Sequence, residues 1–314
     1  MKTTITGPYP RVGSELGNKL RKEINNGTVS KELATKLSNE IIKELFSAGI
    51  DIPNSGLVEV HDELSWPLEF ASGIEFGGMK KIFHTNTHYR EPIVVGEIKQ
   101  CESTHFDVIE NTKIELPGPY TLATLSVEGA KHPYKNFKEI AHAYAQFLKD
   151  TVYTIQGIAP LIQFNEPSVI AHGKQKEDLE ILPELYAHLL DGIKQKTAVW
   201  TFYGQYDEKT LDILLSLPVD AVGLDFVWHP EVAELLKKKS PQKGIGFGII
   251  DCGDRGYIGI ENAPKIVEQI KKLEGHVDFE KSYISTNATL EHLPRDYARK
   301  KAELIGQIKY EVSK

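Results

Sequence analysis

Acidic side chains follow several apolar runs of the sequence, at the point where each run ends. Glu166 comes after LIQFN, Asp225 after VDAVGL, and Asp251 after GIGFGII. Carboxylates that gather in one place raise one another's pKa, and a carboxyl group tuned in this way can bind an amine or transfer a proton. Glu166, Asp225 and Asp251 are therefore candidate catalytic residues.

The same three acids also have a structural interpretation. A carboxylate at the end of a strand can accept hydrogen bonds from the amides of the loop that follows. An arginine could also hold such acids in place, and Arg11 and Arg255 are the candidates for that part. The residue types alone leave catalysis, amine binding and loop support open.

The histidines and cysteines do not form a convincing metal site. His84 and His88 are four residues apart in FHTNTHY, a segment with an extended pattern. In a strand, two imidazoles at that spacing share a face but lie too far apart for easy chelation. Cys101 and Cys252 lack C-x-x-C spacing, and the segment around Cys252 holds no histidine that could activate its thiol. We therefore expect no metal ion bound by this chain.

The acids are positioned by the strands that precede them. Apolar runs alternate with segments of helical spacing, as in a (β/α)8 barrel, whose working face lies at the carboxyl ends of its parallel strands. The predicted fold class is therefore α/β, a (β/α)8 TIM barrel forming one domain over residues 1–314. The expected strands are 3–7, 49–54, 113–116, 157–164, 197–203, 219–226, 244–250 and 282–286.

Helix signals agree with this alternation. Ser30 is suited to cap a helix that stops at Gly49, and a helix from Phe137 leads to the central strand. Pro294 fits the first position of a closing helix, because a missing amide donor is harmless there. Residues from about 55 to 108 break the pattern, and we interpret them as an insertion over the barrel mouth. Within it, VEVHDELSWPLEF fits a loop and a helix, and residues 81–98 alternate like two extended segments. A doubly wound sheet is the competing fold, but no G-x-G-x-x-G follows an early strand.

Composition excludes several classes of function. The 314 residues carry a net charge of −7 from 37 basic and 44 acidic side chains, without a basic cluster for a phosphate backbone. No apolar run approaches the roughly 18 residues of a membrane span. Two distant cysteines indicate neither a disulfide framework nor a zinc ribbon. We expect a soluble, cytoplasmic protein that binds neither nucleic acid nor membrane.

Several motifs in combination resemble one family, cobalamin-independent methionine synthase, and specifically its amino-terminal half. The resemblance extends from about Thr3 to Arg295. It rests on a Pro-Arg-Val-Gly loop after the first strand, a Lys-x-Phe-x-Thr-Asn-x-His-Tyr segment, a Pro-Gly-Pro turn, a Glu-Pro strand end, a Leu-Pro-Val-Asp strand and a His-x-Pro ending. These are residues 10–13, 81–89, 117–119, 166–167, 217–220 and 292–294.

The resemblance implies a reaction and a metal. Full-length members are expected to have two (β/α)8 barrels, of which the carboxyl-terminal one binds zinc through a His-x-Cys pair, a Glu and a second Cys. Zinc holds homocysteine as the thiolate, and the methyl group comes from a methyltetrahydrofolate polyglutamate. A free thiol is mostly protonated near neutral pH, and coordination to zinc removes that proton.

This sequence contains no His-x-Cys. Its strand end at 199–203 reads Val-Trp-Thr-Phe-Tyr, and its last strand leads to Asn287 without a cysteine. The resemblance therefore implies the amino-terminal half as a separate chain. Its expected partners are a zinc-bearing carboxyl-terminal-type barrel and a methylated folate or related pterin, and it is expected to hold no cofactor of its own.

The resemblance also points to substrate-binding residues. Family members bind the glutamate tail of the donor through cations of an Arg-Glu-Leu-Lys loop and through the lysine that opens the Lys-Trp-Phe segment. Here the first loop reads Leu16-Gly17-Asn18-Lys19, so its arginine is lost, and the second cation matches Lys81. The candidate substrate-binding residues are Arg11, Lys19, Lys81 and His88.

Two other functions remain open at this stage. The chain could be an autonomous enzyme that uses Glu166, Asp225 and Asp251 on an unidentified small molecule. It could also be a purely structural or binding barrel. Activity without a partner would favour the first of these, and partner activity that does not depend on Lys19 and Lys81 would favour the second.

Overall fold

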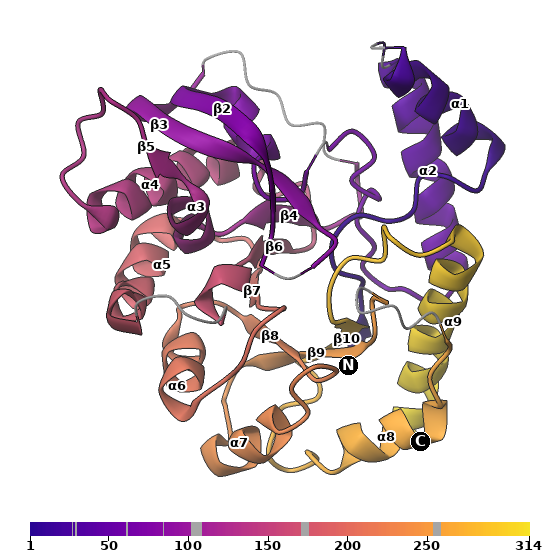
Figure 1. Ribbon diagram of the computed structural model, residues 1–314. Coiled ribbons are helices and arrows are strands. Elements are labelled where there is room, and N and C mark those ends of the chain that lie inside the picture. The colour runs from indigo at the N-terminus through magenta and orange to yellow at the C-terminus, as the bar shows by residue number, and fades with distance from the viewer. Residues whose placement is uncertain are drawn as a thin grey trace. The chain divides into compact units, whose positions relative to one another are not determined.

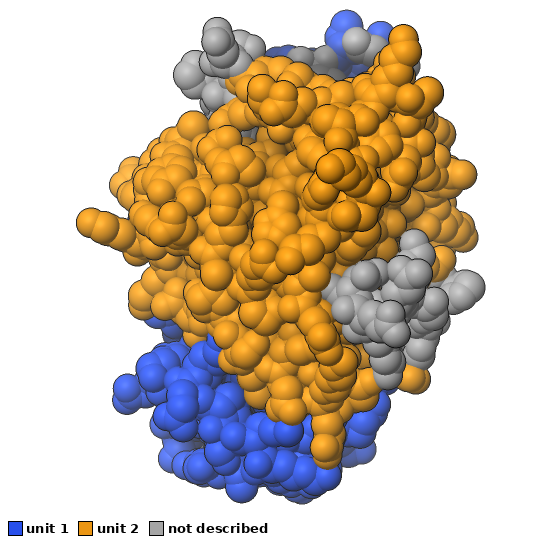
Figure 2. All heavy atoms as spheres, turned by 90° about the vertical axis from the view of Figure 1, so that its left-hand side faces the viewer, with its two compact units in different colours: residues 1–60, 111–113, 223–314 blue, residues 61–110, 114–222 orange. Residues whose placement is uncertain are grey.

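A computed structural model describes residues 1–26, 28, 30–60, 62–83, 85–101, 109–170, 176–253 and 259–314. The chain divides into two compact units, coloured separately in Figure 2. Unit 1 comprises Met1–Val60, Asn111–Lys113 and Gly223–Lys314, and unit 2 comprises His61–Glu110 and Ile114–Val222. The prediction of a single domain stays a prediction, and each unit is described by itself.

Unit 1 contains parallel strands in the order β1 (Lys2–Thr3), β10 (Tyr283–Thr286), β9 (Gly244–Ile250) and the end of β8 (Ala221–Asp225). Thr3 lies opposite Ile284, and Tyr283 opposite Gly246. The amide of Phe226 donates to the carbonyl of Gly248 at 2.9 Å, which extends the contact between β8 and β9 past the end of β8. The β8, β9 and β10 strands thus end side by side, next to Asp225, Asp251 and Asn287.

The strand predicted for residues 49–54 is reduced to a single parallel bridge between Thr4 and Ile52. The amide of Ile52 donates to the carbonyl of Thr3 at 3.0 Å, and the carbonyl of Pro53 accepts from the amide of Lys113 at 2.8 Å. Pro53 has no amide hydrogen, so a longer ladder cannot form there.

Five helices of unit 1 are α1 (Glu15–Asn25), α2 (Lys31–Ser47), α7 (Val232–Lys239), α8 (Ala263–Lys271) and α9 (Arg295–Val312). The side chain of Ser30 accepts a hydrogen bond from the amide of Leu33, so the predicted cap of α2 is confirmed. The sequence patterns did not predict α1. Pro294 is the N-cap of α9 and not its first helical residue, because its ψ of 138° is extended.

Unit 2 contains parallel strands in the order β7 (Thr197–Trp200), β6 (Ile162–Asn165) and β4 (Ile114–Pro117). Ile162 lies opposite both Ile114 and Thr197, which brings the carboxyl ends of the three strands to one level. Helices alternate with these strands (Figure 1). They are α3 (Pro119–Leu125), α4 (Phe137–Ile155), α5 (Leu182–Leu190) and α6 (Glu208–Ser216).

The insertion supplies β2 (Ala71–Lys81) and β3 (His88–Gln100) of a second sheet in unit 2, and β5 (Val127–Glu128), which lies beyond the insertion, pairs with β3. A 3₁₀ helix, Trp66–Phe70, precedes β2. The sequence predicts two extended segments within residues 81–98. β3 occupies most of that stretch and is confirmed, but its antiparallel partner β2 lies before it, over Ala71–Lys81. The chain therefore has an α/β fold of the TIM-barrel type with an insertion after the second strand position. None of the helices in the described ranges is both long and apolar enough to cross a bilayer.

Candidate functional site

Glu166 is fully buried in unit 2, directly after β6. One carboxylate oxygen, Oε1, accepts hydrogen bonds from the amide of Tyr120 and the hydroxyl of Tyr186, both at 3.1 Å, and Oε2 accepts one from the amide of Thr121 at 2.7 Å. Tyr120 and Thr121 lie in the first turn of α3. The carboxylate thus satisfies amides that a helix leaves without an internal partner.

Burial raises the pKa of Glu166 to about 7, and the hydrogen bonds from Thr121, Tyr120 and Tyr186 act in the opposite direction. Burial also raises the pKa of Tyr186, and the adjacent carboxylate adds to that shift. A proton on Glu166 near neutral pH fits general acid–base chemistry, whereas the three hydrogen bonds from its own chain fit the structural interpretation.

Gly118 is needed for this arrangement. A β-carbon added at Gly118 would lie 2.1 Å from the carboxyl carbon of Glu166, well inside contact distance. Only glycine therefore lets β4 lead into α3 while Glu166 occupies the space beside it. The Pro-Gly-Pro turn was a visible signal in the sequence, but its dependence on Glu166 was not.

Asp225 is fully buried in unit 1. Its Oδ1 accepts hydrogen bonds from the amides of Val227 and Trp228, both at 3.0 Å. The side-chain amide of Asn287 donates to Oδ1 at 3.4 Å and to Oδ2 at 3.3 Å. Asn287 Oδ1 in turn accepts from the amide of Cys252 at 2.8 Å. Burial raises the pKa of Asp225, and the donors oppose that rise. This network joins the ends of β8, β9 and β10.

Asp251 is partly buried and accepts a hydrogen bond from the amide of Gly253 at 2.7 Å. Its own amide donates to Oε1 of Glu261 at 2.8 Å, and the same oxygen accepts from the ammonium group of Lys301 at 2.8 Å. Lys301 is fully buried, so this ion pair is shielded from water. Asp251 therefore shapes the start of the loop after β9.

Two of the candidate cations lie in unit 1. The Arg11 guanidinium donates to Glu291 and to the carbonyls of Val58 and Val60, and so ties the first loop to two other segments. Lys19 lies on the exposed face of α1 and pairs only with Glu15 among the contacts described, at 2.6 Å. Arg255, the alternative partner for the acids, lies outside the described residues.

Lys81 and His88 lie directly opposite each other, at the end of β2 and the start of β3. Both side chains are exposed. The hydroxyl of Thr87, one residue before β3, lies 3.4 Å from the hydroxyl of Tyr203. Tyr203 follows β7, so the tip of the insertion meets a segment at the carboxyl end of a barrel strand. Lys81 and His88 thus lie opposite each other, and Thr87, next to His88 in the chain, contacts the segment after β7.

Two residues in these segments have unusual backbone conformations. Phe83 has a φ of 51° and Tyr203 a φ of 72°, in the left-handed region that bulky side chains rarely adopt. Such conformations persist only where surrounding contacts hold them, and they concentrate at functional sites. Neither residue stood out in the sequence, because backbone strain has no signature in residue type. His84 lies outside the described residues.

The chain's donors do not fit the zinc site expected in the family's other half. Cys252 is buried at the end of β9 in unit 1, and Cys101 is exposed at the end of β3 in unit 2. Within the described ranges, no three His, Cys, Asp or Glu residues are grouped so that they could hold a metal ion. The expectation of no metal stays a prediction.

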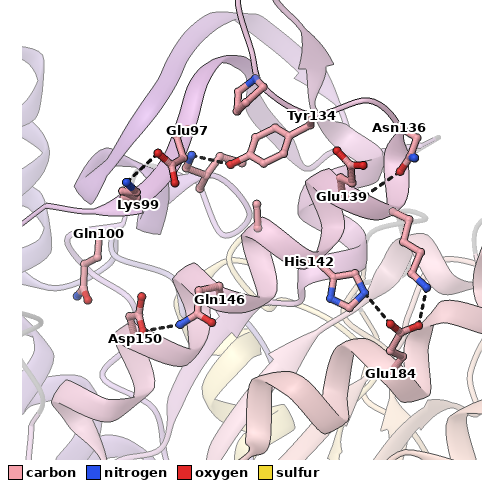
Figure 3. A pocket seen from close by; sticks show the side chains of 14 residues that line it. Glu97, Lys99, Gln100, Tyr134, Asn136, Glu139, His142, Gln146, Asp150 and Glu184 are labelled. Carbon is pink, nitrogen blue, oxygen red and sulfur yellow. Dashed lines mark hydrogen bonds and ion pairs between the residues drawn. The ribbon is translucent and has the colours of Figure 1, made fainter.

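An open groove of about 1190 Å³, not predicted from the sequence, lies between β3 and α4 (Figure 3). The charged side chains that line this groove form ion pairs with one another. Glu184 pairs with Lys138 at 2.7 Å and lies 3.3 Å from His142, while Tyr134 accepts a hydrogen bond from the amide of Ile98 at 2.8 Å. These internal pairs leave little net attraction for a charged ligand.

Comparison with known proteins identifies the family. Residues 74–277, more than half of the chain, match the model of the cobalamin-independent synthase, N-terminal domain. The chain belongs to this family. The motif-based resemblance is therefore confirmed.

Curated relatives are similar along nearly their whole length. A methionine synthase of Saccharolobus islandicus (strain L.S.2.15 / Lassen #1) is 27% identical over 321 residues, covering 96% of this chain and 91% of the relative. A methionine synthase of Sulfolobus acidocaldarius is 27% identical over 328 residues, covering 98% and 91%. The chain is thus comparable in extent to proteins that carry that name.

Solved structures confirm the fold. A B12-independent methionine synthase from Shewanella sp. W3-18-1, in complex with selenomethionine, superposes with a TM-score of 0.74 at 19% identity, covering 98% of this chain and 97% of that one. A putative vitamin-B12-independent methionine synthase from Listeria monocytogenes gives a TM-score of 0.72 at 13% identity, covering 99% of each chain.

The raised pKa of Glu166 predicts a pH-dependent stability. Between about pH 4.5 and 7 the folded chain retains a proton that the unfolded chain has lost, so the free energy of unfolding falls as the pH rises through this window. The full effect is roughly 3 kcal/mol. We expect Glu166→Gln to remove this part of the pH dependence in urea unfolding at pH 5 and pH 8.

The control is Glu303→Gln, which changes an exposed carboxylate on α9. It should retain the wild-type pH dependence. An equally steep fall in stability in Glu166→Gln would contradict the assignment of a shifted pKa to Glu166.

Proposed function

We propose that this chain is the amino-terminal-type subunit of a split cobalamin-independent methionine synthase. In this proposal, a methyl group passes from a methyltetrahydrofolate-like donor to homocysteine in a complex with a zinc-bearing partner barrel. The observation that carries the proposal is a chain with the motifs of the N-terminal domain family but without the His-x-Cys pair of the expected zinc site. We place the reaction in the cytoplasm.

The chemistry explains why a partner is needed. Methyl transfer to sulfur requires a thiolate, and the zinc of the partner would supply it by lowering the pKa of the homocysteine thiol. In this chain Cys252 is buried, and Asn287, which binds its backbone amide, also binds Asp225. These residues support neighbouring strand ends and do not form a site for thiol activation.

We assign this chain the binding of the donor's anionic tail. Lys81 is exposed beside His88, near the Thr87–Tyr203 contact, so a carboxylate can reach it from solvent. Lys19 is held only by an exposed pair with Glu15 among the described contacts, and such pairs are weak enough to exchange for a substrate carboxylate. Arg11 is held by Glu291 and two carbonyls, which suits support of the loop.

The alternative of an autonomous enzyme has less support. Glu166, Asp225 and Asp251 each accept hydrogen bonds from backbone amides of the segment next to them. These bonds fit the structural interpretation of strand-end carboxylates better than a reactive one. The prediction that the three acids form one catalytic site stays a prediction.

Reconstitution tests the proposal. The purified chain, assayed alone with homocysteine and methyltetrahydrofolate, should form no methionine above background. Addition of the zinc-bearing barrel from the same organism should raise methionine formation at least tenfold over that of either chain alone. Equal turnover by the zinc-bearing barrel with and without this chain would contradict the proposal, as would methionine formation by this chain alone.

The tail-binding part is tested by Lys81→Ala in the reconstituted enzyme. We expect KM for triglutamyl methyltetrahydrofolate to rise about two- to fivefold, the size of one exposed ion pair, while KM for the monoglutamyl donor stays unchanged. Lys99→Ala is the matched control, because Lys99 is an exposed lysine of the same sheet, paired with Glu97. Equal effects on both donors, or from both variants, would count against tail binding by Lys81.

A further inference from the structure

β2 is the outer strand of the sheet β2-β3-β5 (Figure 1). Within the described ranges, no strand pairs with its outer edge, although the strand is 11 residues long. Its last residues are exposed, and Met79 has 58% of its surface accessible. A long open edge of this kind is a template for another strand.

In the first half of β2, every second residue directs its backbone amide and carbonyl away from β3, toward the outer edge of the sheet. In an antiparallel pair, residues alternate between facing their partner strand and facing away from it. The carbonyl of Val94 accepts from the amide of Gly129, so Val94 faces away from β2. Ile74, which lies opposite Val94, therefore presents its own amide and carbonyl to the outer edge. Two residues further, Phe76 does the same, opposite Pro92, which has no amide hydrogen to offer.

A β-bulge then shifts by one residue which positions of β2 face outward. Phe76 pairs with Pro92 and Met79 with Arg90, so that Gly77 and Gly78 together lie opposite one residue of β3. Beyond β2, the amide of Ile82 donates to the carbonyl of Thr87, which makes that pair a hydrogen-bonded one. Counting back from Ile82, Lys81 and Met79 face outward. The outward set is thus Ile74, Phe76, Met79 and Lys81.

This set is complementary to itself. In an antiparallel pairing with a second copy, Phe76 can lie opposite Met79 of that copy, and Ile74 opposite Lys81. Both pairs join residues that present backbone groups outward. In a strand without a bulge, residues that face outward are separated by an even number of positions. Phe76 and Met79 are three positions apart, so without the bulge one of them would turn its backbone amide and carbonyl inward and the pair could not form. The bulge therefore creates the match.

The charges agree with the same register. Glu75 would lie opposite Lys80 of the second copy, twice in a symmetric dimer. Within the sheet, Glu75 lies opposite Ile93 and Lys80 opposite Tyr89. Ile93 and Tyr89 are four residues apart on β3, so their side chains lie on the same face of the sheet. The side chains of Glu75 and Lys80 therefore share that face as well. Lysines on an edge usually deter pairing, but an acid at the matching position turns repulsion into attraction.

We propose that the outer edge of β2 binds a second copy of this chain, through an antiparallel β2–β2 pairing in which Glu75 faces Lys80, Phe76 faces Met79, and Gly77 faces Gly78. This proposal is independent of the proposed function. In the dimer, Ile74 of the second copy would lie opposite Lys81, so the partner copy would border the candidate tail site.

Charge exchange tests the pairing. Sedimentation equilibrium of the chain alone should give twice its 35.2 kDa mass. Glu75→Lys and Lys80→Glu should each weaken dimerisation at least about tenfold, because each converts two attractive pairs into two repulsive ones. The double variant Glu75→Lys/Lys80→Glu should restore the wild-type dissociation constant, and its recovery also shows that a β2 strand with both substitutions folds.

Glu97→Lys and Lys99→Glu are the matched controls, since they make the same charge changes at exposed positions of β3. Neither should alter dimerisation. A monomer at all concentrations up to 100 µM would overturn the proposal. A dimer insensitive to the single substitutions, or a double variant as weak as the single ones, would overturn it as well.

Discussion

The arrangement of unit 2 depends on one buried carboxylate, that of Glu166, which accepts hydrogen bonds from backbone amides of its own chain. Glu166 ends β6, binds the first turn of α3 and the hydroxyl of Tyr186 on α5, and excludes any side chain at residue 118. One buried group thus sets the relative positions of one strand and two helices. Asp225 plays a comparable part in unit 1, where Asn287 connects it to the end of β9. In both units, polar groups at strand ends first satisfy backbone donors.

Sequence periodicity predicted most of this fold, because the alternation of apolar strands and amphipathic helices is written in local residue types. The helix caps at Ser30 and the strand that ends at Asn165 are local in this sense. Other features depend on distant contacts. Tyr186 meets Glu166 across 20 residues, and Thr87 meets Tyr203 across 116. The shortening of the second strand follows from Pro53, a signal that was present but outweighed by the apolar pattern around it.

The candidate site was predicted in part. Residue type placed Glu166, Asp225 and Asp251 at strand ends, but it could not say that each would accept hydrogen bonds from backbone amides. Motif comparison placed Lys81 and His88 in one segment, and the antiparallel register brings them opposite each other. Together these findings describe a member of the family in which the three acids accept hydrogen bonds from backbone amides and in which Lys19, Lys81 and His88 are exposed. In the proposed function, activation of the thiol is the step left to the zinc-bearing partner.

That division of labour is tested most directly by the zinc content of this chain. The purified protein, dialysed against a mild chelator and then against buffer with equimolar zinc, is analysed by plasma mass spectrometry beside the zinc-bearing barrel treated in the same way. The account predicts well under 0.1 zinc per chain here, and about one per chain in the other barrel. One tightly held zinc per chain in this protein, lost on Cys252→Ser, would contradict it.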